Sequence, residues 1–144
     1  MEVMYSDDQG NIIYGKPKKI NGKFNYQFKE SNTKIYIESE VVVFTNVTIQ
    51  SVGNGNTIKI GRNCNIKGEL LVAHTSLIVI ANRVKFNAAC RIHAAEGKKI
   101  MIGDDCLFAN VRFRTSDSHS ILDLDTQQRL NLAEDRCGQS CLDC

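Results

Sequence analysis

A recurring pattern of apolar residues constrains this chain more than any other feature of its sequence. Pairs of apolar residues, two positions apart, return every six residues, and three pairs make one copy. The four copies are Ile35, Ile37, Val41, Val43, Val47 and Ile49; Ile58, Ile60, Cys64, Ile66, Leu70 and Val72; Ile78, Ile80, Val84, Phe86, Cys90 and Ile92; and Ile100, Ile102, Cys106, Phe108, Val111 and Phe113. The last pair comes one position early. Repeats are identified first because they decide the fold.

The spacing predicts short strands separated by tight corners. Two apolar residues two positions apart lie on one face of a strand. Six residues are too few for a strand plus a hairpin, and helical spacing is not kept. Three strands then form one triangular coil, with extra corner residues expected at Ser51–Asn56, near Ala73–Ser76 and at Ala94–Lys98. One coil cannot bury its own apolar face, so the coils must stack. The alternative is an antiparallel sandwich of short strands.

The pattern resembles the hexapeptide-repeat transferases, which fold as left-handed parallel β-helices. The matching stretches are Ile60-Gly61-Arg62-Asn63-Cys64-Asn65-Ile66 and Ile102-Gly103-Asp104-Asp105-Cys106-Leu107-Phe108, and the resemblance covers about 35–135. It implies an all-β chain: a left-handed parallel β-helix of about four coils, with a polar loop after the fourth. The expected segments are an N-terminal polar segment with a partial coil (1–34), the coils (35–113), a loop of the catalytic type (114–135) and an aberrant Cys-rich tail (136–144).

Composition narrows the class of protein. The 144 residues fit one domain, and a net charge of +2 is too small to indicate binding to nucleic acid or to a membrane surface. No apolar run reaches transmembrane length, and residues 1–10 lack the features of a signal peptide. We therefore expect a cytoplasmic protein with reduced cysteines. Cys64, Cys90 and Cys106 occupy inward repeat positions, where they are expected to fill the core as small apolar residues.

The segment from Arg114 to Asn131 breaks the repeat. It is rich in Ser, Asp and Thr and contains His119. Polar segments that leave a rigid scaffold commonly carry function, and histidine is the usual general base near neutral pH. A histidine in a polar loop does not by itself establish catalysis. However, the segment resembles the branch of the hexapeptide family that acetylates capsular and other surface polysaccharides.

That resemblance implies a mechanism and a set of partners. His119 would deprotonate a sugar hydroxyl, and the alkoxide would attack the thioester carbonyl of acetyl-CoA, the co-substrate, without an acyl-enzyme and without a metal. The active site of the family lies between subunits, so the implied partner is a second copy of the chain in a homotrimer. The other partner is a sugar or polysaccharide acceptor.

Three further residues are candidates for substrate binding. Asp117 either orients the imidazole of His119, holds the acceptor sugar or caps the loop. Asn110 lies near the place where related enzymes have a substrate-facing Asn, although the missing residue after Phe108 shifts the match. Arg129 either contacts substrate or pairs with an aspartate nearby in the sequence, Asp123 or Asp125.

The tail departs from the pattern of the family, which continues with further coils and a Trp-Ile-Gly. Cys137, Cys141 and Cys144 have the C-x-x-x-C-x-x-C spacing that holds a [4Fe–4S] cluster in radical SAM enzymes. That motif needs a following α/β barrel to bind its nucleotide, and none follows in this sequence. Codons allowed for 135–144, read one nucleotide later, spell Ile-Val-Val-Asp-Asn-Arg-Val-Trp-Ile, which restores both the repeat and the Trp. We therefore expect a frameshifted, truncated acetyltransferase with impaired activity.

Two other functions remain open. The first is a non-catalytic β-helix with a structural or interaction role, in which changing His119 has no effect on any activity. The second is the zinc-dependent carbonic anhydrase branch of the same fold. The chain has three histidines, His74, His93 and His119, but it lacks the close His pair of that branch.

Overall fold

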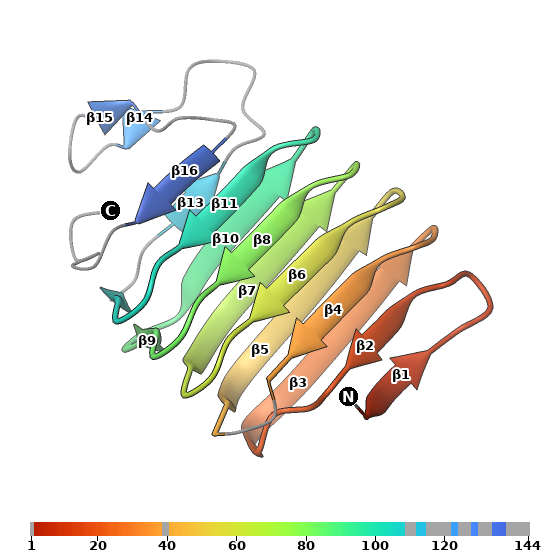
Figure 1. Ribbon diagram of the computed structural model, residues 1–144, viewed down its shortest axis with the longest axis horizontal. Coiled ribbons are helices and arrows are strands. Elements are labelled where there is room, and N and C mark those ends of the chain that lie inside the picture. Colours follow the sequence, from red (N-terminus) through yellow and green to blue (C-terminus); the bar gives the residue numbers. More distant parts are fainter. Residues whose placement is uncertain are drawn as a thin grey trace.

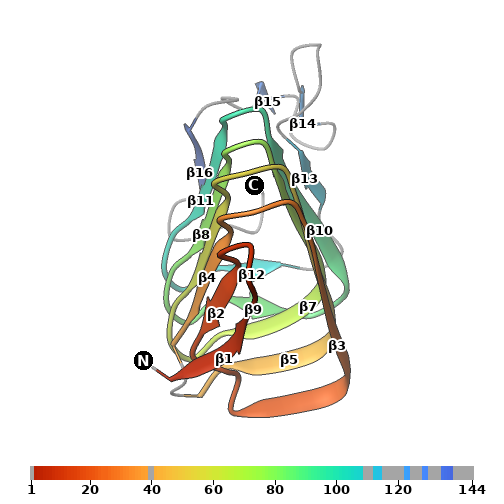
Figure 2. The same cartoon turned by 90° about the vertical axis from the view of Figure 1, so that its right-hand side faces the viewer.

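The computed structural model describes residues 2–38, 41–108 and 112–114, together with the backbone of three short strands at 122–123, 128–129 and 134–137. Its described part is a stack of coils built from β-strands (Figure 1). Viewed along the stack, each coil has three sides (Figure 2). The fold is the parallel β-helix that the six-residue period predicts, and the antiparallel sandwich is excluded by the parallel pairing of successive coils.

One side of every coil belongs to the first sheet. Its strands pair in the order β1 (Val3–Ser6), β2 (Ile12–Tyr14), β4 (Lys34–Ile37), β6 (Thr57–Ile60), β8 (Leu77–Ile80), β11 (Lys99–Ile102) and β16 (Glu134–Cys137). All neighbours are parallel except β1, which runs antiparallel to β2 at the N-terminal edge. The register places Ile35, Ile58, Ile78 and Ile100 in one inward column.

The other two sides belong to the second sheet. Its long strands bend and cover both sides: β3 (Lys19–Lys29), β5 (Val43–Val52) and β7 (Asn65–Ala73). In the next two coils the sides are separate strands, β9 (Lys85–Phe86) with β10 (Cys90–Ala95), and β12 (Leu107–Phe108) with β13 (Arg112–Arg114). A separate hairpin pairs β14 (Leu122–Asp123) with β15 (Gln128–Arg129).

The bend in β7 depends on Gly68. Its φ is +109°, and a Cβ built there would collide with the backbone carbonyl oxygen of Cys90 in the next coil. Any side chain at this position would therefore force the two coils apart, whereas glycine allows the backbones to stack.

The core is a column of aliphatic and aromatic side chains inside the coils. The predicted inward residues are buried in the second, third and fourth copies as far as Phe108. The ring of Phe86 meets the ring of Phe108 edge-on, with centroids 5.5 Å apart. The prediction that Phe113 comes one position early in its copy is also confirmed. Ile78 pairs with Ile100 and Ile92 pairs with Phe113, so the segment from Ile100 to Phe113 is one residue shorter than the segment from Ile78 to Ile92.

The three inward cysteines are buried, as expected for residues that fill the core. Burial raises the pKa of the Cys64 thiol. The Sγ of Cys106 lies 3.1 Å from the carbonyl oxygen of Gly103.

The first copy differs from its predicted phase. The buried middle pair is Val42 and Phe44, while Val41 is 44% exposed. The link between Ile37 and this pair is one residue longer than the equivalent link in later coils. The extra residue reverses which of the alternating side chains point inward. Val47 is buried as expected, but it pairs with Gly68 rather than with Leu70.

A further coil precedes the four repeats, within the segment for which a partial coil is expected. β2 and β3 form a coil of their own, which pairs in parallel with the coil of β4 and β5. Its inward side chains on β3 are aromatic and partly buried, and Tyr5 on β1 packs against two of them. The ring centroids of Tyr5 lie 5.0 Å from Tyr26 and 5.3 Å from Phe28. These rings close the N-terminal end of the core.

One corner of the coils contains a buried polar ladder. The buried corner is formed by Asn11, Thr33, Asn56 and Ser76, each of which directly precedes a strand of the first sheet, and by the adjoining Ser51. Asn56 donates from Nδ2 to Ser51 Oγ at 2.9 Å and to the carbonyl oxygen of Val52 at 2.9 Å. Its Oδ1 accepts from the backbone N–H of Ser76 at 3.0 Å. Each coil is thus bonded to the next inside the core.

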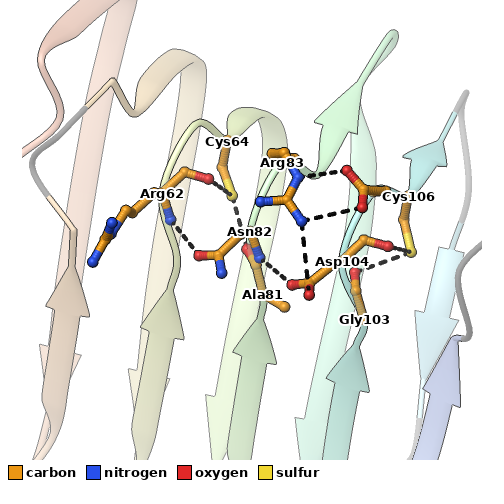
Figure 3. Close-up of polar contacts among 9 residues, drawn as sticks. Arg62, Cys64, Ala81, Asn82, Arg83, Gly103, Asp104 and Cys106 are labelled. Carbon is orange, nitrogen blue, oxygen red and sulfur yellow. Dashed lines mark hydrogen bonds and ion pairs between the residues drawn. The ribbon is translucent and has the colours of Figure 1, made fainter.

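A second corner contains an exposed polar ladder. The exposed corner follows the strands of the first sheet and is formed by Arg62, Asn82, Arg83, Asp104 and Asp105 (Figure 3). Asn82 Oδ1 accepts from the backbone N–H of Arg62, and Asp104 Oδ1 accepts from the backbone N–H of Asn82, both at 2.9 Å. Arg83 donates to both carboxylate oxygens of Asp105, at 2.6 and 3.1 Å.

Candidate functional site

The residues predicted for catalysis and substrate binding lie largely beyond the structural description. His119, Asp117 and Asn110 are outside the described residues. Only the backbone of Arg129 is described: it is in β15, paired with Leu122, while Asp123 pairs with Gln128. The roles predicted for these four side chains therefore stay predictions.

The strand that leads into the predicted catalytic loop is described. β13 ends at Arg114, directly before Thr115, and it pairs in parallel with β10. The register joins Arg91 to Arg112 and His93 to Arg114. Because Ile92 between them is buried, Arg91 and His93 lie on the outer face of the solenoid.

On the neighbouring strand β7, Glu69 faces these residues. Glu69 is the register partner of Arg91. Its Oε1 lies 3.8 Å from Arg91 Nε and 3.6 Å from His93 Nε2. The side chain of His93 is 20% exposed, that of Glu69 29% and that of Arg91 60%. A carboxylate thus lies beside a guanidinium and an imidazole on an outer surface from which the predicted catalytic segment departs.

We call the group formed by Arg91, His93 and Arg112 the cationic strip. Arg112 is exposed, and beside the strip the backbone of Arg114 pairs with that of His93. Neighbouring parallel strands are about 4.8 Å apart, so the backbones that carry these residues are close together. Guanidinium groups on neighbouring strands, such as those of Arg91 and Arg112, suit the binding of carboxylates or phosphates.

His93 lies in the middle of β10, whereas His74 is an exposed corner residue with a φ of +56°. The signal that could have found the strip is the register column of Leu70, Ile92 and Phe113, since the residues that precede its members are Glu69, Arg91 and Arg112. Their separation in the chain hides the cluster until the register is known.

Among the described residues, no group of three or more His, Cys, Asp or Glu side chains is arranged to hold a metal ion. A helix with the length and apolarity needed to cross a membrane is also not found among those residues.

Comparisons with known proteins support the resemblance. No protein-family model matches the chain. A polysialic acid O-acetyltransferase of Neisseria meningitidis is 27% identical over 134 residues, which cover 76% of this chain and 62% of the relative. One of Escherichia coli O1:K1 / APEC is 32% identical over 79 residues, which cover 54% of this chain and 25% of the relative.

A search of solved structures finds a similar protein of the same kind. The crystal structure of the polySia-specific acetyltransferase NeuO matches with a TM-score of 0.67 at 27% identity, over 90% of this chain and 58% of the NeuO chain. This chain resembles the polysialic acid O-acetyltransferases. The similarity extends to both sequence and fold, and it is to acyltransferases. The chain spans about a quarter and about three fifths of the lengths of the two sequence relatives.

Proposed function

We propose that this protein transfers an acetyl group from acetyl-CoA to a hydroxyl group of a polysaccharide or its precursor. The observation that carries the proposal is the combined match in fold and sequence to polysialic acid O-acetyltransferases, over 90% of the chain in the structural comparison. The cationic strip at the start of the predicted catalytic loop is consistent with it, since polysialic acid bears carboxylates.

In the proposed reaction, His119 accepts the proton of the acceptor hydroxyl group while the oxygen of that hydroxyl attacks the thioester carbonyl of acetyl-CoA. The C–O bond forms, the C–S bond breaks, and the CoA thiolate leaves and takes the proton back from His119. Asp117 and Asn110 bind or orient the substrates, and Arg129 contacts substrate or pairs with a nearby aspartate. The reaction needs no metal, takes place in the cytoplasm and uses a site completed by a second subunit of a homotrimer.

We further propose that the DNA encoding 135–144 carries the continuation of the repeat in another reading frame. The register pairs Asp135 with the buried Ile100 and Cys137 with the buried Ile102. The shifted frame has Ile and Val at these two positions, which suit inward columns, whereas an aspartate does not. Reading the gene across these codons tests the proposal, and an immediate stop in the shifted frame would refute it.

The proposed activity is tested by measuring release of the CoA thiol with polysialic acid as acceptor, in the present chain and in the frame-restored chain. Changing His119 to Ala should lower kcat by roughly 10²–10⁴-fold, because the general base is lost. The matched control is His74→Ala, which removes an exposed corner histidine. Absence of transfer in both chains would refute the proposal and favour the non-catalytic solenoid.

A further inference from the structure

We propose that the free edge of strand β3 binds an extended segment of a partner protein, which adds one strand to the second sheet. In this segment, apolar residues that face the core alternate with acidic residues that face solvent. The surface lies at the N-terminal end of the stack of coils (Figure 1). Its use as a docking site does not depend on acetyl transfer.

The two sheets end differently at the N-terminal end of the stack. The first sheet ends in β1, which pairs with β2, whereas the second sheet ends in β3, which among the described residues pairs only with β5. Since β2 and β3 belong to one coil, β1 extends the first sheet one strand farther than the second. With 11 residues, β3 is the longest described strand. A long strand without a neighbour is a template for the backbone of another chain.

A contact at the end of β3 shows which backbone groups face the free edge. The carbonyl oxygen of Lys29 accepts from the N–H of Gly53 in the next coil, at 3.0 Å. Successive residues of a strand turn their backbone N–H and C=O groups to opposite edges. The groups of Gln27 therefore also face β5, while those of Tyr26 and Phe28 face the free edge. A strand added at this edge forms its hydrogen bonds with Tyr26 and Phe28.

The inward side chains along this edge are apolar and incompletely covered. Ile20 is in an inward position, because its register partner Phe44 is fully buried, yet Ile20 is 42% exposed. The ring of Tyr5 packs against Tyr26 and Phe28, but both of these side chains stay only partly buried. Apolar residues of an added strand would remove this surface from water, which favours association.

The charges on β3 determine the kind of partner. The strand carries the exposed Lys19, Lys23 and Lys29 and no acidic residue. Opposite charges on neighbouring strands stabilise a pair of strands, and like charges destabilise it. A second copy of β3 is therefore repelled, and a strand with acidic outward residues is attracted. Lysines on an edge strand also discourage pairing with uncharged strands, so the same residues select for an acidic partner.

The experiment uses the whole chain and two synthetic peptides. In one peptide valine alternates with glutamate, and in the other valine alternates with lysine. Fluorescence anisotropy measures the affinity for each peptide, and hydrogen exchange followed by NMR measures the protection of single amides. We expect the wild type to prefer the glutamate peptide. Its binding should slow exchange at the amides of Tyr26 and Phe28 but not at Gln27, whose N–H already faces β5.

Changing Lys23 and Lys29 together to Glu should reverse the preference between the peptides. Each exposed pair of opposite charges contributes about threefold to affinity, so the double variant should bind the glutamate peptide about tenfold more weakly and the lysine peptide about tenfold more tightly. The matched control is Lys99→Glu. It makes the same change at an exposed position of β11, which has a neighbour on both sides, and should alter neither affinity.

Reversed preference, together with slower exchange at Tyr26 and Phe28, supports the proposal. Binding of neither peptide overturns it and leaves the lysines with a protective role alone. Equal binding of the two peptides, or binding without slower exchange at these amides, also overturns it, because the contact is then not a charge-selective pairing of strands. A wild-type dimer in sedimentation, with the two amides already protected without peptide, assigns the edge to a second copy and overturns it as well.

Discussion

Two corners of each coil use the same geometry in different surroundings. At the buried corner, the side chain of Asn56 bonds the turn of its own coil to that of the next, and it is fully buried. At the exposed corner, Asn82 makes the equivalent contact to the backbone of Arg62, but on the surface (Figure 3). Water can replace a lost hydrogen bond only at the second site. The contribution of a polar ladder to the free energy of unfolding therefore depends on whether water can reach it.

The largest effect is expected at the buried corner. Changing Asn56 to Ala removes the acceptor of the Ser76 N–H and the donor to Val52, and leaves buried polar groups unpaired. We expect a loss of about 3 kcal/mol in the free energy of unfolding, measured by urea denaturation. The matched control is Asn54→Ala in the same turn. Asn54 is exposed and accepts from Ser31, so its loss should cost less than about 1 kcal/mol.

An equal loss of unfolding free energy in the two variants would contradict this expectation, because burial would then not determine how much each hydrogen bond stabilises the fold. The two variants remove the same atoms from the same turn, so differences in helix or strand propensity do not enter. An unchanged dependence of the unfolding free energy on urea concentration would show that both variants unfold from the same compact state.

A smaller effect is expected for Asn82→Ala at the exposed corner. The lost acceptor leaves the N–H of Arg62 facing solvent, and the contact from Asn82 N–H to Asp104 remains. We expect a loss of up to about 1 kcal/mol, since water satisfies the freed donor. The same urea experiment measures it, and a loss as large as that of Asn56→Ala would remove the distinction between the corners.

The smallest effect is expected for the pair of Arg83 and Asp105. Hydrogen bonds from the Arg83 guanidinium lower the pKa of Asp105 from its ordinary value of 3.8. A lowered folded-state pKa stabilises the fold above the unfolded-state value, and this contribution disappears as the pH falls through the folded value. Because both side chains are about half exposed, at 50% and 53%, water and salt screen the pair.

Thermal unfolding of the wild type and of Asp105→Asn at pH 7 and pH 2.5 checks this expectation. The two proteins should differ slightly at pH 7 and agree at pH 2.5. The carboxyl of Asp7, whose pKa is also lowered, chiefly by its hydrogen bond from Asn11, is present in both proteins and cancels from the difference. A difference that grows at low pH would have the wrong sign for a carboxylate stabilised by a cation.

The second, third and fourth repeats show how far the sequence predicts this fold. Their inward residues alternate with polar ones, so the period of two fixes which side chains enter the core. The first repeat fails for an identifiable reason. Val41, Val42, Val43 and Phe44 are all apolar, so the alternation has no visible phase there. Packing selected Val42 and Phe44, and left Val41 exposed.

The candidate site was predicted less completely. The loop with His119 was found from its break in the repeat, and its role stays a prediction. The sequence did not predict the cationic strip. Glu69 and Arg91 are 22 residues apart and Arg91 and Arg112 are 21 apart, and none of the three forms a motif with its neighbours in sequence. Only the pairing of β7, β10 and β13 brings them to one surface.

The sequence by itself determined the kind of fold. A six-residue apolar period leaves one way to bury the inward side chains, which is to stack the coils and pair their backbones. The tertiary structure alone decided the register between coils, and with it which polar residues become neighbours. Outward side chains face solvent rather than the core, so no pattern of apolar residues in the sequence indicates which of them become neighbours. The contacts of Glu69 with Arg91 and His93, and the placement of Arg112 beside Arg91, therefore emerge only after the strands are aligned.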